Sequence, residues 1–143
     1  FAPDGEKGVK GRMRGCYHAS GGKPAGRIVI CEGYATGASI HEATGDAVAV
    51  AFNAGNLGPV AVALHKAYPA LMLVIAADDD WCTEGNTGLS AARQAALAVG
   101  GLVVMPQFPT GRPPKATDFN DLATLAGLAA VRACFTEIEE AAC

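Results

Sequence analysis

The stretch LMLVIAADDDW, residues 71–81, places seven apolar residues directly before three consecutive carboxylates. An apolar run of this length, bounded by polar residues, predicts a strand that is buried on both faces, as in a parallel sheet. Three neighbouring carboxylates repel one another, and burial raises the cost of ionising them. The stretch therefore predicts a buried strand that ends where water or a cation compensates the negative charge.

The rest of the chain repeats this pattern, because apolar segments of strand length alternate with segments of helical period from Arg27 onward. Such alternation is typical of βαβ units and a parallel sheet, and right-handed crossovers place the helices on both faces. We therefore predict an α/β fold with about four, mostly parallel strands. The predicted strands are 27–32, 47–52, 71–77 and 102–106, and the predicted helices are 34–45, 57–68, 89–101 and one or two within 118–142.

The size and composition of the chain limit the class of protein to which it can belong. Its 143 residues are half hydrophobic, which suits one domain with a proper core. No apolar run approaches the roughly 18 to 20 residues that a membrane span needs. Five cysteines without a C-x-x-C pair suggest a reducing cytoplasm rather than a disulfide framework. The chain begins without Met or a signal-peptide pattern, so we expect a domain from a longer protein.

Charge is unevenly distributed along the sequence. Residues 1–27 contain six of the eleven basic residues and two of the fourteen acidic ones, a balance of +4, whereas the remainder carries −7. A basic segment beside an acidic body can steer a polyanion toward the domain, or it can simply be a solvated arm. We expect residues 1–26 to form a basic lead-in with a small strand pair, and residues 27–143 to form the main domain.

Acidic residues follow three of the predicted elements at the edge where the parallel strands end. Glu32 closes the first strand, Asp78 and Asp80 close the third, and Asp118 lies beyond the fourth. Ligands of open α/β sheets bind at this edge. Side chains alternate along an extended segment, so Asp78 and Asp80 should face one side and Asp79 the other. Two carboxylates on one side are suited to a hard divalent cation such as Mg²⁺.

Each acidic position also has a plain structural interpretation. The triplet can be a solvated turn, and Glu32 can interact with a helix dipole. Asp118 is a favoured N-cap residue, Asp121 is a typical first-turn acid, and Asn120 suits either purpose.

Weaker signals concern phosphate binding. NAGNLGP, residues 53–59, follows the second strand, and Asn53 and Asn56 lie in it with glycines that can offer backbone N–H groups to a phosphate. A turn and helix cap explain this segment nearly as well. Arg112 and Lys115, upstream of Asp118, are candidates for phosphate contacts or for loop solvation.

The order of three motifs, CEGYATGASI, AADDD and DFNDL, resembles the Toprim domain of bacterial-type primases, topoisomerases and some nucleases. The resemblance covers residues 27 to about 126. More narrowly, EGYATGASI, AFNAGNL and DFNDL resemble the Toprim domains of plasmid- and phage-encoded primases of the TraC and primase–helicase kind. VKGRMRGCYH resembles the segment that precedes Toprim in those proteins.

The resemblance implies roles for particular residues. Glu32 becomes the general acid/base, Asp78 and Asp80 become ligands of Mg²⁺ or Mn²⁺, and Asp118 becomes a further acid near the metals. The chain departs from some relatives at Thr36, where they carry a second acid. It also carries Asp79 where relatives often have a small residue.

The activity implied by the resemblance is that of the catalytic core of a DNA primase, a nucleotidyltransferase that makes RNA primers from nucleoside triphosphates on single-stranded DNA. We expect other primase domains, of helicase or zinc-binding type, as partners, a cytoplasmic location, and weak or no activity of the domain alone. The expected nucleotide or nucleic-acid contacts are Lys10, Arg12, Arg14, Asn53, Asn56 and Lys115.

Three other functions remain open at this point. A Toprim nuclease would use the same metals to cleave a phosphodiester. An aspartyl-phosphate phosphatase would use Asp78 as nucleophile and Asp80 as acid/base, leaving Glu32 without a role. A non-catalytic module of a replication protein would bind nucleic acid without metal.

Overall fold

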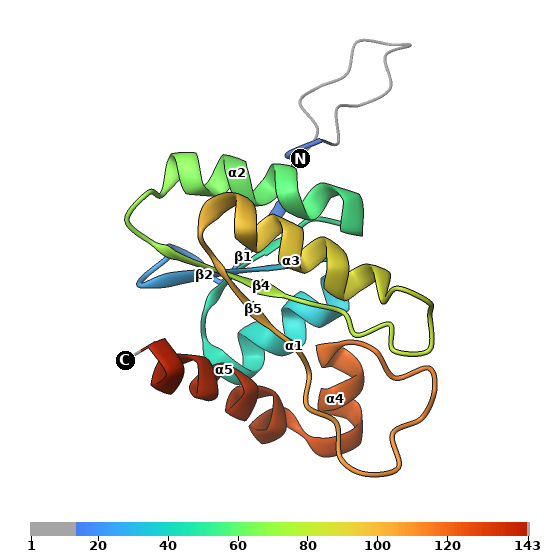
Figure 1. Cartoon of the computed structure of the whole chain (residues 1–143). Helices are drawn as coiled ribbons and strands as arrows, with labels where there is room; N and C mark the ends of the chain where they lie inside the picture. Colours follow the sequence, from blue (N-terminus) through green and yellow to red (C-terminus); the bar gives the residue numbers. More distant parts are fainter. Residues whose placement is uncertain (1–13, 143) are drawn as a thin grey trace, which may run out of the picture.

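A computed structural model describes residues 14–142, the last four by their backbone alone, and shows one five-stranded sheet (Figure 1). The strand order is β1-β3-β2-β4-β5. Strands β3, β2, β4 and β5 run parallel to one another, whereas β1 pairs antiparallel with β3. This architecture confirms the predicted α/β fold. The strands are β1 (His18–Ser20), β2 (Arg27–Cys31), β3 (Ala47–Val50), β4 (Met72–Ala76) and β5 (Leu102–Val104).

Helices cover both faces of the sheet. In Figure 1, α2 and α3 lie above it, and α1, α4 and α5 lie below it. A short 3₁₀ helix, η1, leads into α2. The bounds are α1 (Tyr34–Thr44), η1 (Ala54–Asn56), α2 (Leu57–Ala67), α3 (Thr87–Val99), α4 (Phe119–Ala126) and α5 (Leu128–Ala142).

The core is divided by the sheet into two apolar clusters. Ile28 and Ile30 of β2 pack with α2 and α3, and Val29 and Cys31 pack with the helices of the other face. This alternation follows from the two-residue repeat of a strand. It explains why the strand sequences are almost entirely apolar, since both faces are buried.

One glycine sets the distance between α1 and the sheet. A Cβ atom at Gly37 would lie 3.0 Å from Val50 Cγ2 and 3.1 Å from the Cys31 sulfur. The absence of a side chain therefore lets α1 lie directly on β2 and β3. This contact fixes the helix that begins just after Glu32.

The sequence predicts all four parallel strands and their helices, with ends that differ by up to three residues. It does not predict β1 as a fifth strand of the sheet. Instead, the expected strand pair lay within residues 9–18, of which 9–13 fall outside the described residues. His18–Ser20 is too short for a periodic signal, and its partner β3 lies about thirty residues further along.

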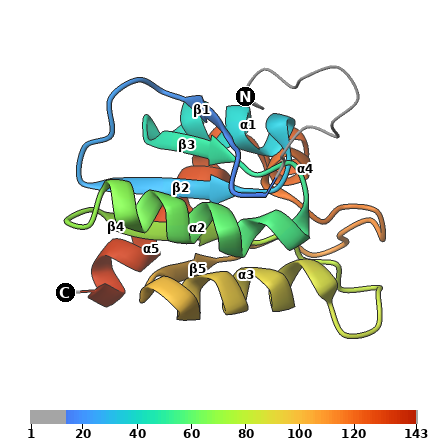
Figure 2. The same cartoon turned by 90° about the horizontal axis from the view of Figure 1, so that it is seen from above.

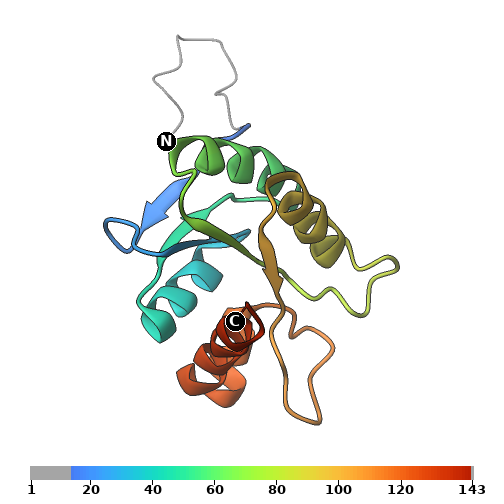
Figure 3. The same cartoon turned by 60° about the vertical axis from the view of Figure 1, so that its left-hand side comes forward.

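The loops after β4 and β5 project from the same edge of the sheet (Figures 2 and 3). They are joined there, because the Asp79 N–H donates a hydrogen bond to the Thr117 carbonyl at 2.8 Å. These two loops and the segments after β2 and β3 form the carboxyl edge. No helix within residues 14–142 has the length and apolar character of a membrane span.

Asn56 fastens the lead-in to the end of β3. Its side-chain oxygen accepts the Gly15 N–H at 2.7 Å, and its amide nitrogen donates to the carbonyls of Cys16 and Ala51, each at 2.9 Å. The residue is 5% exposed. One buried side chain thus ties together two segments forty residues apart.

We expect Asn56→Ala to lower the free energy of unfolding by roughly 2–4 kcal/mol, because it leaves buried backbone groups without partners. Asn53→Ala, at an exposed neighbouring position, should change it by less than about 0.5 kcal/mol. Urea unfolding of the two variants and the wild type makes the measurement. Equal losses for both variants would show that Asn56 does not fasten the lead-in.

Candidate functional site

Glu32 is held at the carboxyl edge by the turn that follows β3. Its backbone carbonyl accepts the Phe52 N–H at 2.8 Å, and its carboxylate accepts the N–H of Ala54. The side chain is partly buried. Two backbone donors of a neighbouring strand's loop therefore position this acid.

Asp78 and Asp80 follow β4 at the same edge. Asp78 has one carboxylate oxygen, Oδ1, that is buried and has no hydrogen-bond partner among the described residues. Asp80 accepts the Gly88 N–H at 2.9 Å, at the start of α3. A Cβ atom at Gly88 would lie 2.7 Å from the Asp78 carbonyl oxygen, so only glycine allows α3 to begin this close to the acids.

Asp79 lies between these two acids but makes a different set of contacts. It is 8% exposed, forms an ion pair with Arg112 at 2.7 Å, and accepts a hydrogen bond from the Asn86 amide at 2.6 Å. Arg112 also donates to the carbonyls of Asp79 and Ala116. Arg112, expected at a phosphate or in loop solvation, is instead the internal partner of Asp79.

Asp118 caps α4 as its residue type suggests. Its side chain accepts the Asp121 N–H at 2.8 Å, and the Asp121 carboxylate accepts the N–H groups of Thr117 and Asp118. Both acids thus complete a capping box. Asp118 also lies close enough to Glu32 and Asp78 for its charge to raise the pKa of each. Asp118 is therefore both the N-cap of α4 and a member of the acidic cluster.

The four carboxylates form one electrostatic cluster. Burial, followed by the charges of Glu32, Asp118 and Asp80, raises the pKa of Asp78 to about 7. Burial and the charge of Asp80 raise the pKa of Glu32 as well, and the two carboxyl groups are close enough to share a hydrogen bond. Residues from three distant parts of the chain thus converge, and the cluster disfavours its own ionisation.

A hard divalent cation fits this donor set. Carboxylate oxygens are the ligands such ions prefer. The Asp78 carboxyl group has one unpartnered oxygen and interacts with the charges of the other three acids. Among the described residues, no group of three or more His, Cys, Asp or Glu side chains is placed so that it could hold a metal ion by itself. Mg²⁺ ordinarily takes one or two carboxylates and completes its shell with waters or phosphates.

The other predicted contacts are scattered. Arg14, Asn53 and Lys115 are exposed, Asn56 is buried with its amide bonded to backbone groups, and Lys10 and Arg12 lie outside the described residues. The Asn56 side chain, predicted to contact nucleotide or nucleic acid, is therefore occupied by backbone groups instead. The signal for it, a strand end rich in Asn and Gly, is shared by phosphate loops and ordinary turns.

Sequence reasoning missed the aromatic side chains at this edge. Tyr34, Phe52 and Trp81 are 62%, 53% and 47% exposed, and each is close in the chain or hydrogen-bonded to an acid of the cluster. Phe52 ends the apolar run AVAVAF and was predicted to belong to the strand. The run itself gives no sign that its last residue leaves the sheet.

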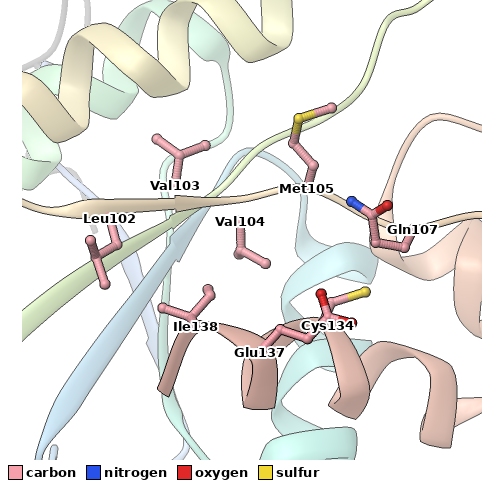
Figure 4. Close-up of a pocket in the computed structure, with 8 residues that line it drawn as sticks. All are labelled: Leu102, Val103, Val104, Met105, Gln107, Cys134, Glu137 and Ile138. Atoms are coloured by element: carbon pink, nitrogen blue, oxygen red, sulfur yellow. The ribbon is translucent and has the colours of Figure 1, made fainter. Parts of the chain in front are cut away.

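Two further features add no functional group to this site. Burial raises the pKa of the Cys31 thiol to about 12, so this residue beside Glu32 is no nucleophile. A hollow of about 330 Å³ runs along β5 and α5 and shares no residue with the acidic cluster. Figure 4 shows Leu102 and Val104 directed toward α5 there, and Val103 directed away.

These observations define an α/β domain with an acidic cluster at the carboxyl edge of its sheet. A family model described as "Toprim domain" matches residues 27–129. The chain therefore belongs to the Toprim family.

Two curated relatives, both described as "DNA primase TraC" from Escherichia coli, are similar to the chain. One is 46% identical over 108 residues, which are 70% of this chain and 10% of the relative. The other is 44% identical over 116 residues, 76% of this chain and 8% of the relative. The chain thus spans about a tenth of the length of these relatives. No solved structure matches it significantly.

We expect Asp78→Asn to raise the melting temperature in metal-free buffer, and to raise it more at pH 8 than at pH 5. The pKa of Asp78 rises from an ordinary 3.8 to about 7 on folding, so the wild type loses stability as pH increases between these values. The amide cannot ionise and avoids that loss. Thermal unfolding in EDTA from pH 5 to 8 measures the difference.

Glu84→Gln is the matched control, because Glu84 is exposed on the loop after β4. Its melting temperature should track that of the wild type at every pH. A pH-independent difference between Asp78→Asn and the wild type would contradict the raised pKa of Asp78.

Proposed function

We propose that this domain is the catalytic core of a DNA primase, which joins nucleoside triphosphates into an RNA primer on single-stranded DNA with Mg²⁺ or Mn²⁺. Family membership and the described activity of the relatives support the proposal. The observation that carries it is the unpartnered Asp78 Oδ1 within a cluster of four carboxylates. Such a cluster is stabilised when a cation enters it.

In this proposal Asp78 and Asp80 hold the divalent cation, and Asp118 adds negative charge beside it. The bound cation would neutralise phosphate charge and promote attack by the 3′-hydroxyl. Asp80 is suited to a ligand role because the first turn of α3 fixes its carboxylate. Asp78 is suited because one of its oxygens is already free of protein partners.

Glu32 is the proposed proton acceptor for the attacking hydroxyl. Its raised pKa makes its carboxylate a stronger base than an exposed Glu. The Ala54 N–H keeps that carboxylate at the edge of the site. Its carboxyl group lies close enough to that of Asp78, the proposed metal ligand, for the two to share a hydrogen bond.

The template and nucleotides are proposed to meet the basic and polar residues around the edge. Arg14, Asn53 and Lys115 are exposed and available for such contacts, and Lys10 and Arg12 extend the basic lead-in. Contacts of this kind give sequence-tolerant binding that weakens with salt.

Other functions would come from further domains of a longer primase. Because the chain spans about a tenth of its relatives, we propose that helicase or zinc-binding domains of a longer primase cooperate with it. We also propose a cytoplasmic location and low activity of the domain alone.

The proposal predicts that Glu32→Gln and Asp78→Asn, each in the full-length protein, reduce primer synthesis by about 100-fold or more, as loss of a general base or metal ligand does. Gel separation of labelled products measures the effect. Glu84→Gln should retain wild-type synthesis. Primer synthesis unchanged in both variants would refute the site assignment, and strand cleavage in place of synthesis would identify a nuclease.

Metal binding can be followed separately through the single tryptophan of the chain. Trp81 directly follows Asp80 and is 47% exposed, so Mn²⁺ bound at the cluster should quench its fluorescence. Asp80→Asn should abolish saturable quenching, and Glu84→Gln should not. DNA binding without any Mn²⁺ binding would favour a non-catalytic module.

A further inference from the structure

Phe52 has a backbone conformation that is unusual for its residue type. Its φ angle is 70°, in the left-handed region, where a bulky side chain is disfavoured and glycine or asparagine is the usual residue. Glycine or asparagine would adopt this backbone conformation with less strain than phenylalanine. Something other than the turn must account for a phenylalanine here.

Core packing does not account for it either. The Phe52 side chain is 53% exposed, and it belongs to neither of the two buried apolar clusters. The residue therefore combines a strained backbone with an exposed ring. Outliers of this kind persist where they serve a site.

The location of Phe52 relates it to the acidic cluster. Its N–H donates to the Glu32 carbonyl at 2.8 Å, and two residues later the Ala54 N–H binds the Glu32 carboxylate. The ring is thus carried by the segment that positions Glu32. Phe52 and Glu32 therefore lie on adjoining segments of the carboxyl edge.

Exposed aromatic residues gather at this edge. Among the described residues, four aromatic side chains are notably exposed, and three of them adjoin acids of the cluster. Tyr34 lies two residues after Glu32, and Trp81 follows Asp80. The fourth, Tyr68, is the C-cap residue that follows α2 and precedes β4, so it lies at the opposite edge of the sheet.

We propose that Phe52 is a base-stacking residue, whose ring packs against a nucleobase of the ligand that the acidic cluster and its cation hold by its phosphates. This rests on the proposed function and adds a contact to it. A ligand that combines phosphates with flat aromatic rings matches a surface that combines a cation site with exposed aromatic side chains. Every base has a π-face, so such stacking is tolerant of sequence.

The test compares a fluorescent oligothymidylate with an abasic oligonucleotide of the same length, which keeps the phosphates and lacks the bases. Anisotropy titrations in Mg²⁺ give the affinity of the full-length protein for each. Phe52→Leu keeps an apolar side chain but removes the π-face. We expect it to weaken binding of the oligothymidylate by about 5- to 100-fold, the range of one lost stacking contact, and to leave the abasic strand unaffected.

Three variants control the test. Phe52→Tyr should restore binding, and Tyr68→Leu should bind like the wild type. Phe52→Asn suits the left-handed backbone, so it should melt no lower than the wild type while losing affinity. If Phe52 had a purely structural role, Phe52→Asn would melt lower than the wild type and keep its affinity.

Competition by a nucleoside triphosphate distinguishes the source of the base. A Phe52→Leu defect for the triphosphate alone assigns the ring to the incoming nucleotide, and a defect for the strand alone assigns it to the template or primer. Equal affinities of Phe52→Leu and the wild type for both ligands would overturn the proposal. So would a wild type that binds abasic and base-containing strands equally. Mn²⁺ quenching of Trp81 should persist in Phe52→Leu, and its absence in the wild type would refute the metal site instead.

Discussion

Repulsion between carboxylates is the constraint around which this domain is organised. Glu32, Asp78, Asp80 and Asp118 come from three separate parts of the chain, and folding forces them together at one edge of the sheet. The consequence is visible in the raised pKa values of Glu32 and Asp78. A fold that keeps such a cluster spends stability on it, which is typical of functional sites.

The cluster is held together by contacts that do not belong to it. The ion pair between Asp79 and Arg112 joins the loop after β4 to the loop before α4. Phe108 and Trp81 lie against the same guanidinium, with ring centroids 4.1 and 4.9 Å from it. Asn86 binds both Asp79 and the backbone N–H of Asp80. The middle acid of the triplet thus anchors the segment that presents its two neighbours.

Sequence reasoning recovers the parts of this arrangement that depend on local pattern. The apolar run of LMLVIAADDD predicts the buried strand and its end, and the two-residue repeat of a strand predicts the opposite orientation of Asp79. It does not predict Arg112 as the partner of Asp79, because that pairing depends on the path of a loop thirty-three residues away. The Asn56 segment is ambiguous for another reason: a short turn rich in Asn and Gly suits phosphate binding as well as hydrogen bonds to the backbone. Strand β1, which the sequence did not predict, and the exposed ring of Phe52 likewise depend on tertiary pairing.

The central claim is that a divalent cation compensates the clustered carboxylates. Crystals of the protein soaked in Mn²⁺ and measured for anomalous scattering test it most directly. The account predicts an anomalous peak within about 2.0–2.4 Å of Asp78 Oδ1 and of an Asp80 oxygen, close to the Mg²⁺ and Ca²⁺ distances to carboxylates. Soaked crystals with no peak between these side chains, or with Asp78 Oδ1 bonded to a protein group instead, would contradict it.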